Sequence, residues 1–162
     1  MNKETGAGIA HLDHREDING YYLEELTVGM SAVFAKTITE SDIVLFSGVT
    51  GDMNPVHVNE EYARGTMFKG RIAHGMLTGS LISTVLGMKM PGPGCIYVSQ
   101  ELKFLAPVRI GDTATARATI VEIIPEKKRV VMETTVHVGD KMVLTGVGKM
   151  MVRSKADQMA AE

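Results

Sequence analysis

The sequence from residue 75 to residue 88 reads Gly75-Met76-Leu77-Thr78-Gly79-Ser80-Leu81-Ile82-Ser83-Thr84-Val85-Leu86-Gly87-Met88. It is apolar at most positions, with small residues interspersed, and a helix that is hydrophobic nearly all round is typically buried. Its glycines, serines and threonines would let neighbouring backbones approach closely. The run Pro91-Gly92-Pro93-Gly94 then breaks the pattern. The sequence therefore predicts a long buried helix that begins at about Gly75.

Most of the chain after this helix has the pattern of β-strands. Strands are predicted over residues 96–107, 113–124, 129–138 and 142–152, with an earlier one over residues 32–38. The strands lack βαβ alternation, and the chain has no phosphate-binding glycine loop. Their short connections favour an antiparallel meander. The predicted fold class is α+β, with a long central helix wrapped by an antiparallel β-sheet.

Shorter helices are predicted between the first strand and the central helix. Thr39 and Asp42 fit the capping pattern that starts a helix, and the apolar residues 43–46 follow. Gly51 would end this helix. A second short helix is predicted to begin at Asn59, with acidic residues in its first turn.

Length and composition limit the classes of protein to consider. At 162 residues with 44% apolar residues, the chain is predicted to form one domain with a real core. The net charge of -2 does not favour nucleic acid or an anionic membrane as a partner. A single cysteine, Cys95, excludes an intrachain disulfide and suits a reducing compartment. No apolar run is long enough to span a membrane, and the first residues do not resemble a signal peptide. We therefore expect a cytoplasmic protein.

The two ends of the chain are polar and lack periodicity. Residues 1–20 are predicted to be a flexible tail, residues 21–153 the folded domain, and residues 154–162 a second tail. The N-terminal tail contains His11, Asp13 and His14, which resemble metal ligands. Metal sites need ligands that converge from a fixed scaffold, so we predict no metal site there.

The candidate catalytic residues lie in the segment Thr50-Gly51-Asp52-Met53-Asn54-Pro55-Val56-His57. Asp52 and His57 bracket Asn54 and Pro55, and the proline stiffens the segment between them. Histidine is a common general base, and a nearby carboxylate can orient a water molecule. This pair suits the addition of water to a double bond conjugated to a carbonyl group. The N-terminus of the central helix, at Gly75, could then stabilise the enolate oxygen through its N–H groups.

The same residues could instead have structural roles. Asp52 could close an Asx turn, and His57 could be a hydrogen-bonded loop histidine. His74 could cap or pack against the central helix rather than act directly. Ser83, inside that helix, could bond back to the preceding turn. Taken one at a time, these residues do not define a site.

Three ordered blocks of sequence together resemble the MaoC-like, (R)-specific enoyl-CoA hydratases. The matching blocks are Ser47–His57 followed by Tyr62-Ala63, then Phe68–Leu77, then Tyr97–Val108 followed by Gly111-Asp112. The resemblance extends over about residues 23–152. It implies the hot dog fold, in which an antiparallel sheet wraps a long central helix.

The resemblance also implies roles for individual residues. Asp52 and His57 would be the catalytic pair that holds the attacking water, and the Gly75 amide would be the oxyanion donor. Ser83 matches a position in the substrate pocket of short-chain members, and Asn54 and His74 are assigned with it to substrate binding. No metal and no cofactor are expected. The expected partners are an acyl-CoA substrate and a second copy of the chain, in a homodimer or a higher homo-oligomer.

The predicted reaction is reversible hydration of a trans-2-enoyl-CoA to an (R)-3-hydroxyacyl-CoA. Two alternatives stay open: an acyl-CoA thioesterase and a non-catalytic acyl-CoA-binding module. The sequence does not assign which member of the Asp52 and His57 pair removes the proton. It also does not give the acyl chain length, the pathway or the residues that bind the CoA phosphates.

Overall fold

The computed structural model describes residues 19–156 of the chain. The predicted N-terminal tail, with its metal-like His11, Asp13 and His14, lies almost entirely outside the described residues. Within residues 19–156, no helix is both long enough and apolar enough to cross a membrane.

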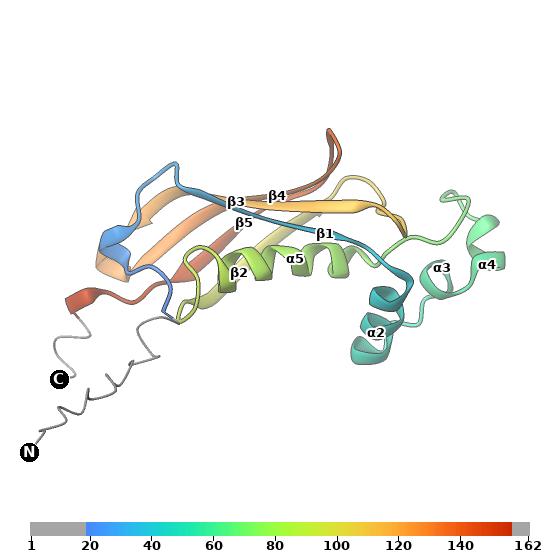
Figure 1. Cartoon of the computed structure of the whole chain (residues 1–162), viewed down its shortest axis with the longest axis horizontal. Helices are drawn as coiled ribbons and strands as arrows, with labels where there is room; N and C mark the ends of the chain where they lie inside the picture. Colours follow the sequence, from blue (N-terminus) through green and yellow to red (C-terminus); the bar gives the residue numbers. More distant parts are fainter. Residues whose placement is uncertain (1–18, 157–162) are drawn as a thin grey trace, which may run out of the picture.

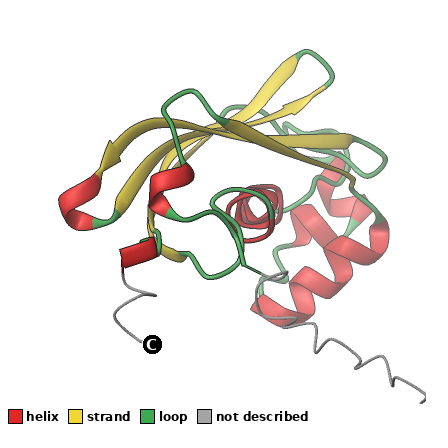
Figure 2. Ribbon diagram, turned by 60° about the vertical axis from the view of Figure 1, so that its left-hand side comes forward, coloured by secondary structure: helices red, strands yellow, loops and turns green. Residues whose placement is uncertain are grey.

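Five antiparallel strands form one sheet that curves around a single long helix (Figures 1 and 2). The strands are β1 (Ser31–Thr37), β2 (Ile96–Phe104), β3 (Thr113–Ile124), β4 (Arg129–Val138) and β5 (Lys141–Met151). The long helix is α5 (Gly75–Met88), as the sequence predicts. Short 3-10 turns, η1 (Leu23–Glu25) and η2 (Pro125–Lys127), lie before β1 and between β3 and β4. The α+β arrangement with a wrapped central helix is confirmed.

The core lies between the inner face of the sheet and α5. Alternate residues of β3 point inward, and three of them are fully buried alanines, Ala114, Ala116 and Ala118. Such small side chains let the helix approach the middle of the sheet. Ile82 and Leu86 of α5 are fully buried, and burying a side chain of this size stabilises the fold by about 1.5–3 kcal/mol.

One face of α5 is exposed, although the sequence predicts burial on most sides. Met76, Ser80, Ser83 and Met88 are the exposed residues of this face. A sheet that wraps one side of a helix leaves the other side uncovered. In a single copy of the chain, the small residues of α5 therefore lie partly at the surface rather than against another backbone.

The order of strands is β1-β3-β4-β5-β2, so the predicted meander is correct only for β3, β4 and β5. In a meander, β2 would pair with β3. Instead all seven residues of β1 pair with that edge of β3, and β2 pairs with β5. β2 consequently forms an edge of the sheet. It also ends at Phe104 rather than residue 107, because the N–H groups of Leu105 and Ala106 both turn to the carbonyl of Val143.

Three short helices precede α5: α2 (Glu40–Thr50), α3 (Pro55–Val58) and α4 (Glu60–Arg64). The predicted capping box of α2 forms between Thr39 and Asp42, and Gly51 ends the helix with a φ of 77°. The sequence does not predict α3, because Asn54-Pro55 is typical of a turn. Asn54 instead caps a helical turn in which the proline occupies a first-turn position, where a missing N–H costs nothing.

Candidate active site

Asp52, His57 and His74 converge beside the N-terminus of α5. A carboxylate oxygen of Asp52 and one ring nitrogen of each histidine lie within 4.8 Å of one another. Asp52 lies between α2 and α3, His57 lies in α3, and His74 directly precedes α5. The N–H of Ile72 bonds to the carbonyl of Val56 at 3.3 Å, which ties the two segments together. The fold thus joins the two sequence blocks in one site.

The ring of His57 is held in one tautomer. His57 is buried, and its Nδ1 lies 2.9 Å from the main-chain oxygen of Ile72. A carbonyl oxygen can only accept a hydrogen bond, so Nδ1 carries the proton and Nε2 keeps a free lone pair. Burial lowers the pKa of His57 below its ordinary value, against the opposing effect of the Ile72 bond. His57 is therefore a neutral base with Nε2 available.

The Asp52 side chain is exposed and only partly used by the protein. Its Oδ1 accepts from the N–H of Asn54 at 3.2 Å, so the Asx turn considered from the sequence does form. Within residues 19–156, Oδ2 has no hydrogen-bond partner. The structural and the chemical interpretations of this carboxylate are therefore compatible.

Gly75 begins α5 at a point where the backbone donors are unpaired. The first N–H that bonds back within this end of the helix is that of Thr78, to the carbonyl of His74 at 3.2 Å, and the His74 side chain does not cap the helix. A Cβ at Gly75 would lie 2.9 Å from Cε1 of Phe104. This end of α5 offers free N–H groups, and a larger residue at Gly75 would have to displace the Phe104 ring.

Two further contacts position α3: a hydrogen bond from the Arg71 side chain and the cap that Asn54 provides. Arg71 donates through Nε to the main-chain oxygen of His57 at 2.6 Å and pairs with Glu40 at 2.8 Å. Asn54 accepts from the N–H of Val56 at 3.2 Å as the cap of α3. The Arg71 contact was not predicted, because a main-chain acceptor leaves no mark in the sequence.

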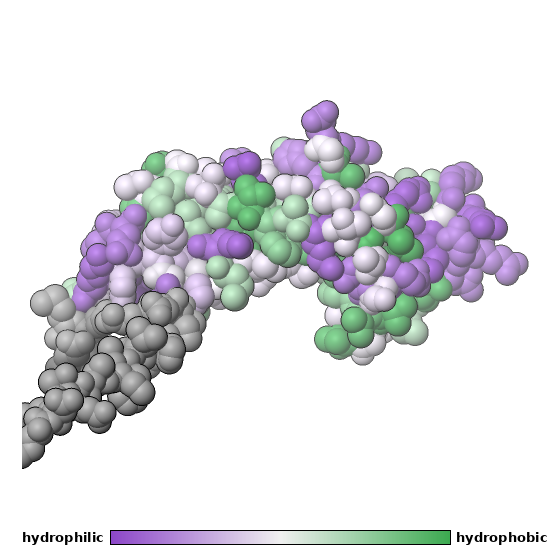
Figure 3. Space-filling model, viewed as in Figure 1, coloured by the Kyte–Doolittle hydropathy of each residue, from purple (hydrophilic) through white to green (hydrophobic). Residues whose placement is uncertain are grey.

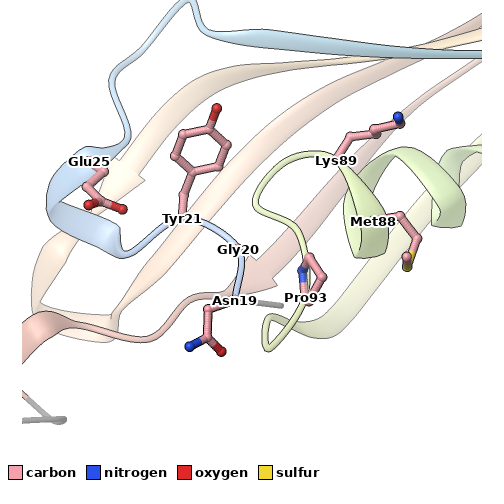
Figure 4. A pocket seen from close by; sticks show the side chains of 7 residues that line it. All are labelled: Asn19, Gly20, Tyr21, Glu25, Met88, Lys89 and Pro93. Carbon is pink, nitrogen blue, oxygen red and sulfur yellow. The ribbon is translucent and has the colours of Figure 1, made fainter. Parts of the chain in front are cut away.

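Cavities lie at both ends of α5 and along its exposed face. A cavity of about 320 Å³ includes Gly75, Thr78 and Phe104 in its lining. Ser83 lies in a different one, of about 440 Å³, between α5 and β2. The fold thus does not place Ser83 beside Asp52. A third cavity, of about 580 Å³, lies near Lys89 at the opposite end of α5 (Figure 4).

Asp52, His57 and His74 also have the donor types of a metal site, but their geometry does not suit one. The two imidazole rings stack with centroids 3.9 Å apart and 31° between their planes. One nitrogen of each ring is also engaged by the main chain: Nδ1 of His57 donates to Ile72, and Nε2 of His74 donates to Asp52. The cluster fits a hydrogen-bonded water better than a metal ion.

Comparison with known proteins agrees with this fold and with the sequence blocks. The family model of the MaoC like domain matches residues 25–142. The chain belongs to the MaoC-like family. It is 54% identical over 140 residues to an (R)-specific enoyl-CoA hydratase of Rhodospirillum rubrum, covering 86% of this chain and 97% of the relative. It is 47% identical over 141 residues to a 3-hydroxybutyryl-CoA dehydratase of Methylorubrum extorquens, covering 86% and 90%.

Solved structures show the same MaoC-like architecture. The R-hydratase PhaJ1 of Pseudomonas aeruginosa superposes with a TM-score of 0.78 at 43% identity, covering 83% of this chain and 86% of that one. The (R)-hydratase of Aeromonas caviae involved in PHA biosynthesis gives a TM-score of 0.77 at 32% identity, covering 80% and 98%. This MaoC-like chain has the hot dog fold that the sequence resemblance implies.

Proposed function

We propose that this protein catalyses reversible hydration of a trans-2-enoyl-CoA to an (R)-3-hydroxyacyl-CoA. The observation that carries the proposal is the tautomer of His57. Ile72 accepts from its Nδ1–H, so Nε2 keeps a free lone pair, and a ring nitrogen of His57 lies within 4.8 Å of an Asp52 carboxylate oxygen. A base and a carboxylate in this arrangement can bind one water molecule between them. The relatives named hydratase and dehydratase support the same reaction.

In the proposed reaction, His57 is the base and Asp52 orients the water. Nε2 of His57 takes a proton from the water as the water oxygen bonds to C3 of the substrate. The electrons of the double bond move towards the thioester oxygen, which becomes enolate-like. Protonated His57 then returns the proton to C2, and the reverse sequence is dehydration. The exposed Asp52 carboxylate stabilises the positive imidazolium while it exists.

Gly75 is the proposed oxyanion donor. Its N–H is unpaired within residues 19–156, and it lies at the positive end of the α5 dipole. Donors of this kind act on charge that develops in the transition state. We further assign substrate contacts to Asn54 and Ser83. The sequence also assigns His74 to substrate binding, but its side chain is only 1% exposed and contacts protein groups instead. The Nδ2 group of Asn54 is not used in capping α3, and Ser83 lines the cavity beside β2.

The proposed functional unit is a homodimer or a higher homo-oligomer in the cytoplasm. β2 is an edge strand of nine residues with a largely exposed surface, and such edges pair readily with another chain. The uncovered face of α5 lies beside it. Apolar side chains also gather over α2, where Leu45 and Val49 are 67% and 87% exposed (Figure 3). The free thiol of Cys95 agrees with a reducing compartment.

The proposal predicts loss of the absorbance of the conjugated enoyl thioester when the protein is mixed with crotonyl-CoA. The product should be the (R)-3-hydroxy thioester, and a series of longer enoyl-CoAs would define the chain-length preference. Release of free thiol without hydration would instead indicate a thioesterase. Tight binding of acyl-CoA without turnover would indicate a binding module. Either result would refute the hydratase assignment.

The lowered pKa of His57 predicts the pH dependence of the reaction. The neutral ring is the reactive form, so kcat/KM should stay constant as the pH falls through about 6.5, the ordinary value for histidine. It should decrease only below the depressed pKa of His57, where the ring becomes protonated. Initial rates of hydration between about pH 5 and pH 8 would measure this. An inflection above 6.5 assigned to His57 would contradict the geometry.

A further inference from the structure

His74 lies where the proposed base, the carboxylate and the oxyanion donor meet. It is 1% exposed, and its ring is packed between α2, α3 and the start of α5. Its ring contacts Phe46 of α2 at a centroid distance of 4.9 Å and His57 of α3 at 3.9 Å. The next residue along the chain is Gly75. A side chain in this place can affect the base, the carboxylate and the oxyanion donor together.

The hydrogen bonds of His74 fix the position of its proton. Its Nε2 lies 3.0 Å from the main-chain oxygen of Asp52 and 3.3 Å from Oγ of Ser47. The Asp52 oxygen can only accept, so Nε2 carries the proton and donates it. Oγ of the buried Ser47 accepts from the same N–H at the longer distance. His74 and His57 are therefore protonated on different ring nitrogens.

The other ring nitrogen of His74 makes no contact that could compete with this bond. Nδ1 is buried and has no hydrogen-bond partner among the described residues. The ring face of His74 lies against the His57 ring at a centroid distance of 3.9 Å. The Nε2–H and this ring face are therefore the two features of His74 that can act on the site.

We propose that His74 is a positioning residue for hydration: its Nε2–H holds the main chain of Asp52, and its ring face supports His57. The proposal rests on the function proposed above and adds a role that differs from substrate binding. Because His74 also precedes Gly75, it sets the spacing between the water-binding pair and the oxyanion donor. Loss of the bond would let the Asp52 segment move relative to α5, and a shift of about 1 Å can cost a hundredfold in rate.

Two substitutions separate the hydrogen bond from the ring. His74→Gln keeps an N–H donor at about the reach of Nε2 and removes the ring, whereas His74→Phe keeps a ring against His57 and removes the donor. We expect kcat for enoyl-CoA hydration to fall about a hundredfold in His74→Phe, with KM changed less than about threefold. His74→Gln should retain kcat within about tenfold of wild type. Circular dichroism and thermal unfolding would show that both variants fold.

The kinetic outcome decides between positioning and other roles. Unchanged kcat in His74→Phe would overturn the proposal. A rise in KM with unchanged kcat would also overturn it, because that pattern belongs to substrate binding. Equal loss of kcat in both variants would show that the N–H donor is not the important feature, and would likewise count against the proposal.

A second readout does not depend on activity. In protein labelled with 15N at the histidine rings, long-range proton–nitrogen spectra report which nitrogen carries the proton. We expect Nε2–H for His74 and Nδ1–H for His57. The opposite tautomer of His74 would overturn the positioning role even in an active enzyme. The expected tautomers in a protein without hydratase activity would instead refute the proposed function alone.

Discussion

His57→Ala is expected to lower kcat for enoyl-CoA hydration by about a hundredfold or more, because it removes the base that takes the proton from water. Asp52→Asn keeps the size of the side chain and its Oδ1 acceptor for the Asn54 N–H, but removes the negative charge. It should also lose most of the activity. Absorbance assays with crotonyl-CoA at saturating concentration would give both values.

A histidine distant from the site provides the control for this comparison. His137 lies on β4 opposite Thr115 and Met142, and it has no place in the proposed chemistry. His137→Ala should therefore keep the wild-type rate. Folded His57→Ala and Asp52→Asn proteins with nearly wild-type rates would show that this pair does not carry the reaction.

Gly146→Ala is expected to destabilise the fold more than other small substitutions. A Cβ at Gly146 of β5 would lie 1.9 Å from the main-chain oxygen of Glu101 in β2. This contact involves backbone rather than the end of a flexible side chain, so the β2–β5 ladder would have to separate. We expect the free energy of unfolding to fall by about 3 kcal/mol, the upper part of the usual range for overpacking. Urea denaturation followed by circular dichroism would measure it.

Gly48→Ala is the matched control for that measurement. Gly48 lies in α2, and a Cβ there would meet no atom within 4 Å. Alanine has the higher helix propensity, so this substitution should raise stability, by about 1 kcal/mol at most. If Gly146→Ala and Gly48→Ala unfolded at the same urea concentration, that result would contradict the close approach of β2 and β5 at Gly146.

The fold was predictable where the local pattern determines the structure. The bounds of α5, β3 and β4 match the sequence predictions, as does the capping box between Thr39 and Asp42. The pairing of β2 with β5 was not predictable in this way, since the choice of partner depends on which sheet edges are already occupied. Helix α3 was missed because Asn-Pro is typical of both turns and helix starts.

The candidate site was only partly predictable for a related reason. Asp52 and His57 lie close in sequence, so their pairing could be inferred from spacing and from the family resemblance. The tautomer of His57 depends on the carbonyl of Ile72, and that of His74 depends on the carbonyl of Asp52. Every residue has a carbonyl, so no residue type indicates which one will act. Tertiary structure is needed to find these contacts.

The most direct test of the proposed function is the fate of water in the reaction. Crotonyl-CoA would be incubated with the protein in water enriched in 18O, and the products analysed by mass spectrometry and chiral chromatography. The proposed chemistry of Asp52, His57 and Gly75 predicts an intact (R)-3-hydroxybutyryl-CoA that carries 18O on C3. It also predicts that His57→Ala forms this product at least about a hundred times more slowly. Free CoA together with 18O in a released carboxylate would contradict the proposal.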